Sequence, residues 1–211
     1  MNLRPYVLGV AIMAMSSGVP VSRLATGTPA APHAVAAPAT TAPPVAVPGT
    51  SLQRLESVWT TDRGTALRLR DLSGSTVVLA LVFTHCPRAC PTLVHELQDL
   101  EDSLRPSELV HTRFVLVTID PERDTPAVLN DYRSTMGLDP ERWVLLHGSP
   151  GDTRELSAVL GFLYGRSGGG GYTHSSLVSV LDRDGVVIHQ QSGVASDLDR
   201  LRAVIRSGRS L

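Results

Sequence analysis

A continuous run of apolar residues, TVVLALVFT at positions 76–84, constrains the fold of this chain more than any other feature. A strand with one face in water alternates apolar and polar residues, whereas a strand covered on both faces is apolar throughout. RFVLVTID at 113–120 and RWVLLHG at 142–148 repeat the pattern. We therefore expect a sheet with helices packed on both of its faces.

Amphipathic segments alternate with these strands. PTLVHELQDLEDSL at 91–104 places four leucines on one helical stripe. TPAVLNDYRSTMG at 125–137 has a threonine cap, a proline in its first turn and a glycine stop. A third helix is expected at 152–165, capped by Asp152 or Thr153.

The C-terminal part predicts a hairpin and a final helix. SSLVSVL and VVIHQ are apolar segments joined by DRDG, which is a strong hairpin signal. SDLDRLRAVIRSG follows as an amphipathic helix. The order β-α-β-α-β-α-β-β-α predicts the α/β class, a sandwich with a central, mostly parallel sheet, a C-terminal antiparallel hairpin and flanking helices.

The first fifty residues predict an export signal and a spacer. Residues 1–23 show an arginine, an apolar stretch and small residues in the order of a signal peptide. The apolar part is short for a membrane span of about 20 residues, so cleavage is expected and a retained N-terminal anchor is the alternative. Residues 24–50 are an Ala/Pro-rich linker. We expect one domain, 51–211, in an extracytoplasmic location, either periplasmic or at the cell surface.

The chain has only two cysteines, Cys86 and Cys90, in the sequence HCPRACP. They stand where a buried strand is followed by a helix, at the edge of the sheet where functional loops collect. Because a helix N-terminus favours thiolate, we expect both thiols to be reactive. A permanent disulfide here would close a loop too small to stabilise the fold much.

Redox exchange and metal binding are the two functional uses for this pair. Residues i and i+4 of a regular helix hold their Cβ atoms about 5–6 Å apart, whereas a disulfide needs ~3.8 Å. Pro91 disfavours a regular helix at Cys90, so both states stay open. The spacing favours a shared metal.

A metal held by two thiolates needs a third ligand, and His174 is the leading histidine. It follows the glycine run 168–171 and begins a strand, so it falls at a sheet end on a mobile loop. His147, at the end of a strand, ranks second. The remaining histidines are expected to point away from the thiols, to be solvated, or to lie in loops and the hairpin: His33, His85, His95, His111 and His189.

Three motifs in the same order, FTHCPRACP, TIDPERDTP and THSS, resemble those of the Sco/SenC copper chaperones. The resemblance runs from about Leu72 to the C-terminus and implies a thioredoxin-like fold. It implies that Cys86, Cys90 and His174 bind copper, with thiolates suited to Cu(I) and an imidazole suited to Cu(II). Many members have an aspartate before the ligand histidine, where this chain has Thr173.

The resemblance also implies partners and a role. The expected acceptor is a cuproprotein such as the cytochrome c oxidase subunit that carries the CuA site, with another periplasmic copper chaperone as a further partner. Nucleic acid is not expected, because 19 basic and 20 acidic residues leave no dense positive patch. We expect the protein to contact the membrane only through its N-terminal segment.

Two rival functions remain beside copper delivery. The first is a thiol–disulfide reductase that keeps the cysteines of a copper acceptor reduced, and the weaker second is a thiol peroxidase. The segment 172–175 stands where a thioredoxin would carry its cis-proline, which argues against a general reductase. One thiol pair can hold copper when reduced and exchange when oxidised. A metallochaperone with thiol–disulfide exchange is therefore preferred over an enzyme.

The segment DPERDTP at 120–126 has a structural and a functional interpretation. Asp124 or Thr125 would cap the helix that a proline opens. Asp120, at the end of a strand, would instead lie near the thiol loop, where it tunes the thiols or meets a partner. Capping is the preferred interpretation.

Overall fold

The computed structural model describes residues 49–166, 172–174, 176–194 and 197–208, with the side chains of Thr173 and His174 left out. The predicted signal and all but the last two residues of the predicted linker lie outside the described residues, as does the glycine run. Within the described ranges, no helix is both long enough and apolar enough to span a membrane.

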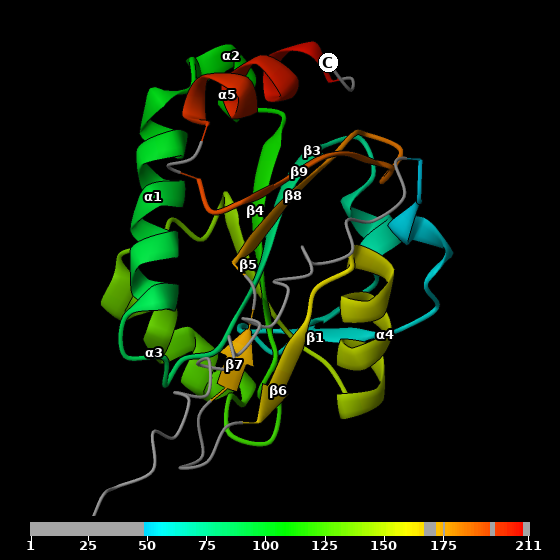
Figure 1. Cartoon of the computed structure of the whole chain (residues 1–211), viewed down its shortest axis with the longest axis vertical. Helices are drawn as coiled ribbons and strands as arrows, with labels where there is room; N and C mark the ends of the chain where they lie inside the picture. Colours follow the sequence, from blue (N-terminus) through cyan, green and yellow to red (C-terminus); the bar gives the residue numbers. More distant parts are fainter. Residues whose placement is uncertain (1–48, 167–171, 175, 195–196, 209–211) are drawn as a thin grey trace, which may run out of the picture. The chain divides into compact units, whose positions relative to one another are not determined.

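A central sheet with the strand order β2-β1-β5-β4-β3-β8-β9 organises the described residues (Figure 1). β3, β4 and β5 are parallel, and β1 and β8 pair antiparallel on either side of them. The predicted α/β class and the C-terminal hairpin are confirmed. The bounds are β1 Trp59–Thr61, β2 Ala66–Leu67, β3 Thr76–Val82, β4 Thr112–Thr118, β5 Trp143–His147, β8 Leu177–Leu181 and β9 Val187–Ser192.

Helices cover both faces of this sheet. α1 joins β3 to β4 and α3 joins β4 to β5, and right-handed crossovers in one direction place both helices on one face. α4 lies on the opposite side of the sheet from α1 (Figure 1). The bounds are α1 Ala89–Ser103, α2 Pro106–Leu109, α3 Pro126–Met136, α4 Pro150–Leu160 and α5 Leu198–Ser207, with short 3₁₀ turns at Leu52–Arg54 and Leu69–Leu72.

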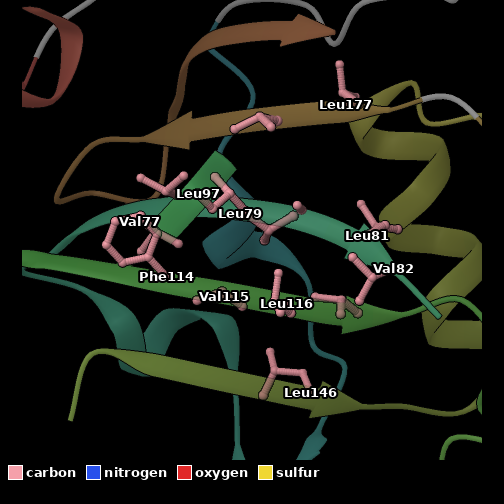
Figure 2. Close-up of a cluster of buried hydrophobic side chains, with 14 of the residues drawn as sticks. Val77, Leu79, Leu81, Val82, Leu97, Phe114, Val115, Leu116, Leu146 and Leu177 are labelled. Atoms are coloured by element: carbon pink, nitrogen blue, oxygen red, sulfur yellow. The ribbon is translucent and has the colours of Figure 1, made fainter. Parts of the chain in front are cut away.

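The core lies between the central strands and α1. All seven residues of β3 are buried, as the apolar run predicts. Leu97 of α1 is fully buried beside Leu79 of β3 (Figure 2). Phe114 of β4 stacks on Trp143 of β5, with ring centroids 4.8 Å apart. Complete burial of β3 therefore fixes the strand whose carboxyl end leads into the loop with the two cysteines.

Helix α3 begins and ends where its cap residues predict. The Thr125 hydroxyl accepts a hydrogen bond from the Val128 N–H at 3.4 Å, so Thr125, and not Asp124, is the N-cap. Gly137 ends the helix with φ of 66°, the left-handed conformation that glycine adopts without strain.

Helix α4 differs from its prediction at both ends. Its N-cap is Ser149, whose Oγ accepts from the Asp152 N–H at 3.1 Å, so neither Asp152 nor Thr153 caps it. A proline suits the first position after such a cap. The helix ends at Leu160 because Gly161 takes the left-handed conformation.

A separate two-stranded sheet was not predicted. β6 (Tyr164–Arg166) and β7 (Tyr172–His174) pair antiparallel, with Tyr164 opposite His174. The residues predicted to end the third helix therefore form β6, the first strand of the hairpin that carries His174.

Candidate metal centre

The two cysteines occupy the turn between β3 and α1. The Cys86 N–H donates to the Phe83 carbonyl at 3.2 Å, which turns the chain away from the strand. Cys90 lies in the first turn of α1, and its N–H donates to the Cys86 sulfur at 3.2 Å. Pro91 fits this first turn, where its missing N–H would have no helical partner. Cys86 thus stands before the helix and Cys90 within it.

Neither thiol forms a disulfide, and both are buried, with 7% of Cys86 and 1% of Cys90 exposed. Burial raises the pKa of Cys90 from 9.0 to about 12, and a hydrogen bond with the Phe83 backbone opposes this only in part. Cys86 and the charge of Asp124 raise the pKa of Cys90 further. The expectation that the helix N-terminus lowers the pKa of this thiol is therefore wrong for Cys90, because burial disfavours the charged thiolate.

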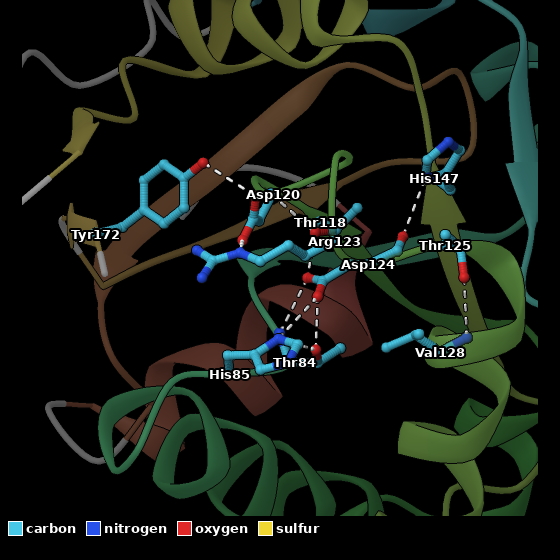
Figure 3. Close-up of polar contacts among 10 residues, drawn as sticks. All are labelled: Thr84, His85, Thr118, Asp120, Arg123, Asp124, Thr125, Val128, His147 and Tyr172. Atoms are coloured by element: carbon cyan, nitrogen blue, oxygen red, sulfur yellow. Dashed lines mark hydrogen bonds and ion pairs between the residues drawn. The ribbon is translucent and has the colours of Figure 1, made fainter. Parts of the chain in front are cut away.

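Asp124 is a fully buried carboxylate that joins the ends of two strands (Figure 3). It accepts from the Thr84 N–H at 3.0 Å and from the Thr84 hydroxyl at 2.5 Å, just after β3. It also accepts from the Thr118 hydroxyl at 2.6 Å, at the end of β4. Sequence reasoning gave Asp124 only a capping role, yet these bonds hold the chain two residues before Cys86.

His85 and His147 both contact Asp124. The exposed His85 Nδ1 is 3.5 Å from Asp124 Oδ1 and 3.0 Å from the Thr84 hydroxyl. His147 Nδ1 lies 3.0 Å from the Asp124 carbonyl oxygen, so this nitrogen carries the proton and donates. This hydrogen bond occupies the nitrogen of His147 that approaches the loop.

The backbone of His174 ends β7, where it pairs with β6, so the prediction that it begins a strand is wrong; its side chain lies outside the described residues. Among the remaining histidines, His95 contacts Gln98 and His189 contacts Gln191, each at 3.0 Å. The described side chains, which exclude the His174 imidazole, contain no group of three or more metal-ligating residues.

Asp120 connects β4 to the hairpin that carries His174. It is 1% exposed and forms an ion pair with Arg123. The Tyr172 hydroxyl donates to Asp120 Oδ1 at 3.2 Å (Figure 3). Sequence reasoning gave Asp120 a minor role and did not single out Tyr172, because nothing in the sequence pairs β7 with the loop after β4.

The donor set of the described loop is suited to a soft metal ion. Two sulfurs lie within one turn of chain, and the side chains of Cys86 and Cys90 are hydrogen-bonded to each other. Soft thiolates select Cu(I) over hard cations, which prefer oxygen. The thiols alone give two ligands, and any third ligand must come from outside the turn.

The family model described as SCO1/SenC matches residues 56–207. A SCO1 protein homolog of Bacillus subtilis (strain 168) is 26% identical over 134 residues, which are 62% of this chain and 69% of that protein. Arabidopsis thaliana ScoI with copper bound superposes with a TM-score of 0.65 at 22% identity, over 76% of this chain and 99% of that one.

A second solved structure is BsSco, described as a member of the Sco family of cytochrome c oxidase assembly proteins with a disulfide switch. It superposes with a TM-score of 0.66 at 22% identity, over 78% of this chain and 96% of that one. At such identities the structures show a shared fold, and they confirm the predicted thioredoxin-like architecture.

Proposed function

The chain belongs to the SCO1/SenC family, and we propose that it is an extracytoplasmic copper chaperone. In this proposal Cys86, Cys90 and His174 bind copper as cargo and deliver it to the CuA site of cytochrome c oxidase. The observation that carries the proposal is the thiol turn itself, in which two cysteines without a disulfide lie together at the carboxyl edge of β3. The copper-bound Arabidopsis relative supports the choice of metal.

Binding would convert the buried thiols to thiolates. The raised pKa of Cys90 means that this thiol is protonated in the empty protein at neutral pH. Copper binding would therefore release that proton, and the charge of the metal would replace it in the buried turn. Cys86 and Cys90 alone suit Cu(I), which accepts few soft ligands.

His174 is proposed as the third ligand. It stands two residues beyond Tyr172 on β7, and the Tyr172 ring packs edge-on against Phe83 with centroids 5.3 Å apart. Phe83 belongs to the same turn as the thiols. Among the described histidines, His147 is the rival: its Nδ1 donates to the Asp124 carbonyl, which leaves Nε2 as the nitrogen that could bind a metal.

Copper titration of the reduced full chain tests the proposal. We expect uptake of one Cu(I) or one Cu(II) per chain, a thiolate-to-Cu(II) charge-transfer band, and loss of both on oxidation to a Cys86–Cys90 disulfide. Tight stoichiometric binding by the oxidised protein would contradict the proposal.

The ligand assignment needs matched histidine variants. His174→Ala should weaken the binding of Cu(II) much more than the binding of Cu(I), because Cu(II) prefers nitrogen ligands and a higher coordination number. His147→Ala should leave both unchanged. If His147→Ala weakens Cu(II) binding and His174→Ala does not, His147 is the ligand. If neither substitution changes copper binding, a function without copper is favoured.

A thiol–disulfide reductase is the alternative function, and the disulfide switch described for BsSco is the observation that favours it. Cys86 and Cys90 would form a disulfide while giving two electrons and two protons to the disulfide of a copper acceptor. A pure reductase would keep this exchange in His174→Ala, so the same variant separates the two functions.

Delivery needs a partner surface and an extracytoplasmic location. A groove of about 310 Å³ opens beside the thiol turn and is lined by Arg88, Ala89 and Leu93 together with Ser176 and Gly193. An acceptor segment lying there would contact Arg88 and Ala89, the residues of the turn between the two cysteines. The location is tested by adding protease to cells with a permeabilised outer layer, where the chain should be digested, and full protection would exclude export.

A further inference from the structure

Tyr172 links the hairpin that carries His174 to two fixed points near the thiol turn. Its hydroxyl donates a hydrogen bond to Asp120 Oδ1 at 3.2 Å (Figure 3). Its ring packs edge-on against the Phe83 ring, at an interplanar angle of 62°. One side chain therefore joins β7 to the ends of both β3 and β4.

The contact at Phe83 lies next to the thiols. The Phe83 carbonyl accepts from the Cys86 N–H at 3.2 Å, and the Phe83 backbone is also hydrogen-bonded with the Cys90 thiol. Phe83 is only 3% exposed, so its ring has little room to move. The Phe83 ring therefore gives the Tyr172 ring a fixed surface beside the turn that presents both sulfurs.

The contact at Asp120 is equally fixed. The Asp120 N–H donates to the Thr118 hydroxyl at 2.9 Å, and Arg123 pairs with the Asp120 carboxylate. The same Thr118 hydroxyl donates to Asp124, the carboxylate that holds the start of the thiol turn. The acceptor of the Tyr172 bond is therefore part of one buried polar network with the loop before Cys86.

Among its described residues, the hairpin is also held by ring contacts of Tyr164 with Phe162 and with Tyr172, each with centroids 6.0 Å apart. It consists of two three-residue strands, and two-stranded hairpins are at best marginally stable alone. Arg166 on β6 lies over the Tyr172 ring at 5.8 Å and pairs with Glu122, but both charged side chains are about 60% exposed, and exposed pairs hold weakly. The Tyr172–Asp120 bond is part-buried and its acceptor is only 1% exposed, so it constrains the hairpin more than the exposed ion pair does.

We propose that Tyr172 is a positioning residue for the copper site. Its hydroxyl, bonded to Asp120, holds β7 against Phe83, so that His174, two residues further along the strand, meets a copper ion on the two thiolates. The inference rests on the proposed ligand role of His174. It predicts that Tyr172 acts on copper only through that histidine.

The test compares two matched tyrosine-to-phenylalanine variants of the reduced full chain. Tyr172→Phe removes the hydroxyl and keeps the ring on Phe83, so the fold should persist. We expect Cu(II) affinity to fall about tenfold, as for loss of other groups that orient a metal ligand, with a weaker or shifted charge-transfer band. Cu(I) affinity and the thermal midpoint of the empty protein should be unchanged.

Tyr164→Phe is the control. Tyr164 lies on the partner strand β6 and carries the same hydroxyl, but it has no contact with Asp120 among those of the described residues. It should bind Cu(II) as the unaltered protein does. Equal losses in the two variants would mean that general loosening of the hairpin, and not the Asp120 bond, is responsible, and would overturn the inference.

A double-mutant cycle with His174→Ala completes the test. In that background Tyr172→Phe should cause no further loss of Cu(II) affinity. A further loss, or an equal loss of Cu(I), would show that Tyr172 acts on the thiols and would overturn the inference. If Tyr172→Phe weakens Cu(II) while His174→Ala does not, the ligand assignment under the proposed function fails, and the positioning role through His174 fails with it.

Discussion

Cys90 shows how one buried side chain couples proton binding to folding. Its pKa in the folded protein is about 12, against 9.0 for an ordinary thiol. As pH rises, the unfolded chain releases this proton first, near pH 9, while the folded chain keeps it. The contribution of Cys90 to stability is thus fully present below pH 9 and is lost between pH 9 and about 12.

We predict that the reduced, metal-free protein loses stability above pH 9 with a slope that Cys90→Ala reduces. Each bound proton that differs between the two states changes the free energy of unfolding by about 1.4 kcal/mol per pH unit. Denaturant unfolding under reducing conditions, from below pH 9 to about pH 11, measures both slopes. Parallel pH profiles for the two proteins would contradict the buried, protonated thiol.

The position of Cys90 was predictable, but its ionisation was not. The motif and the apolar run place both cysteines after β3, as the structure confirms. A helix N-terminus alone would lower a thiol pKa, and the sequence shows that helix. The sequence does not show how deeply the fold buries the sulfur, and this burial decides whether the pKa of the thiol is raised or lowered.

At the scale of elements, Asp124 joins β3 and β4 to the start of α3. Three of its hydrogen bonds come from Thr84 and Thr118, at the ends of the two parallel strands. Its carbonyl also accepts from His147, at the end of β5. The carboxyl edge of the sheet is thus tied together by a residue that follows β4 by six positions.

We predict that Asp124→Asn lowers the free energy of unfolding by about 1–3 kcal/mol. The amide turns one acceptor oxygen into a donor, so one buried partner on Thr84 or Thr118 loses its bond. Denaturant unfolding measures the loss, with the exposed Asp131→Asn on α3 as the control, which should stay within about 0.5 kcal/mol. Equal stability of both variants would contradict the network.

Local signals predicted some elements better than others. Thr125 and Gly137 bound α3 as expected, because a cap and a left-handed stop act within a few residues. The α4 prediction began two residues late because Ser149 and its proline were not used as the cap. β7 was missed as a strand, since its short partner follows a helix-like apolar segment and the pairing depends on contacts with distant loops.

At the scale of the whole domain, β1 extends the sheet beyond β5 through a buried ion pair. Asp62, just after β1, accepts from Nε and Nη2 of Arg133 on α3, each at 2.5 Å. Arg133 also donates to the Trp143 carbonyl at 3.0 Å, and the Leu145 N–H donates to Asp62 at 3.3 Å. This pair therefore ties the first strand to a helix and a strand that follow it by more than seventy residues.

The sequence predicted the central strands but not this edge. The strand at Trp59–Thr61 is too short for an apolar period, and two of its three residues are threonines. An aspartate and an arginine 71 positions apart carry no pattern that pairs them. The parallel strands were predictable because a strand that is buried on both faces consists of consecutive apolar residues. The position of the edge strand β1 depends instead on a single long-range ion pair.

We predict that Arg133→Met lowers the free energy of unfolding by about 3–5 kcal/mol, because it leaves the Asp62 carboxylate buried without its partner. The double variant Arg133→Met/Asp62→Leu should recover much of the loss, since no charge then remains uncompensated. Arg70→Met is the matched control: it breaks the exposed pair with Glu56 and should cost at most about 1 kcal/mol.

Denaturant unfolding of the four proteins, with the unaltered chain as reference, measures these differences. The ion pair lies at the edge strand β1, and neither residue contacts the thiol turn in any bond found among the described residues. Cu(I) uptake by the folded fraction of each variant should therefore match that of the unaltered chain. Two results would contradict this role of the Asp62–Arg133 pair. The first is a loss of unfolding free energy in Arg133→Met no larger than in Arg70→Met, and the second is a double variant that is less stable than Arg133→Met.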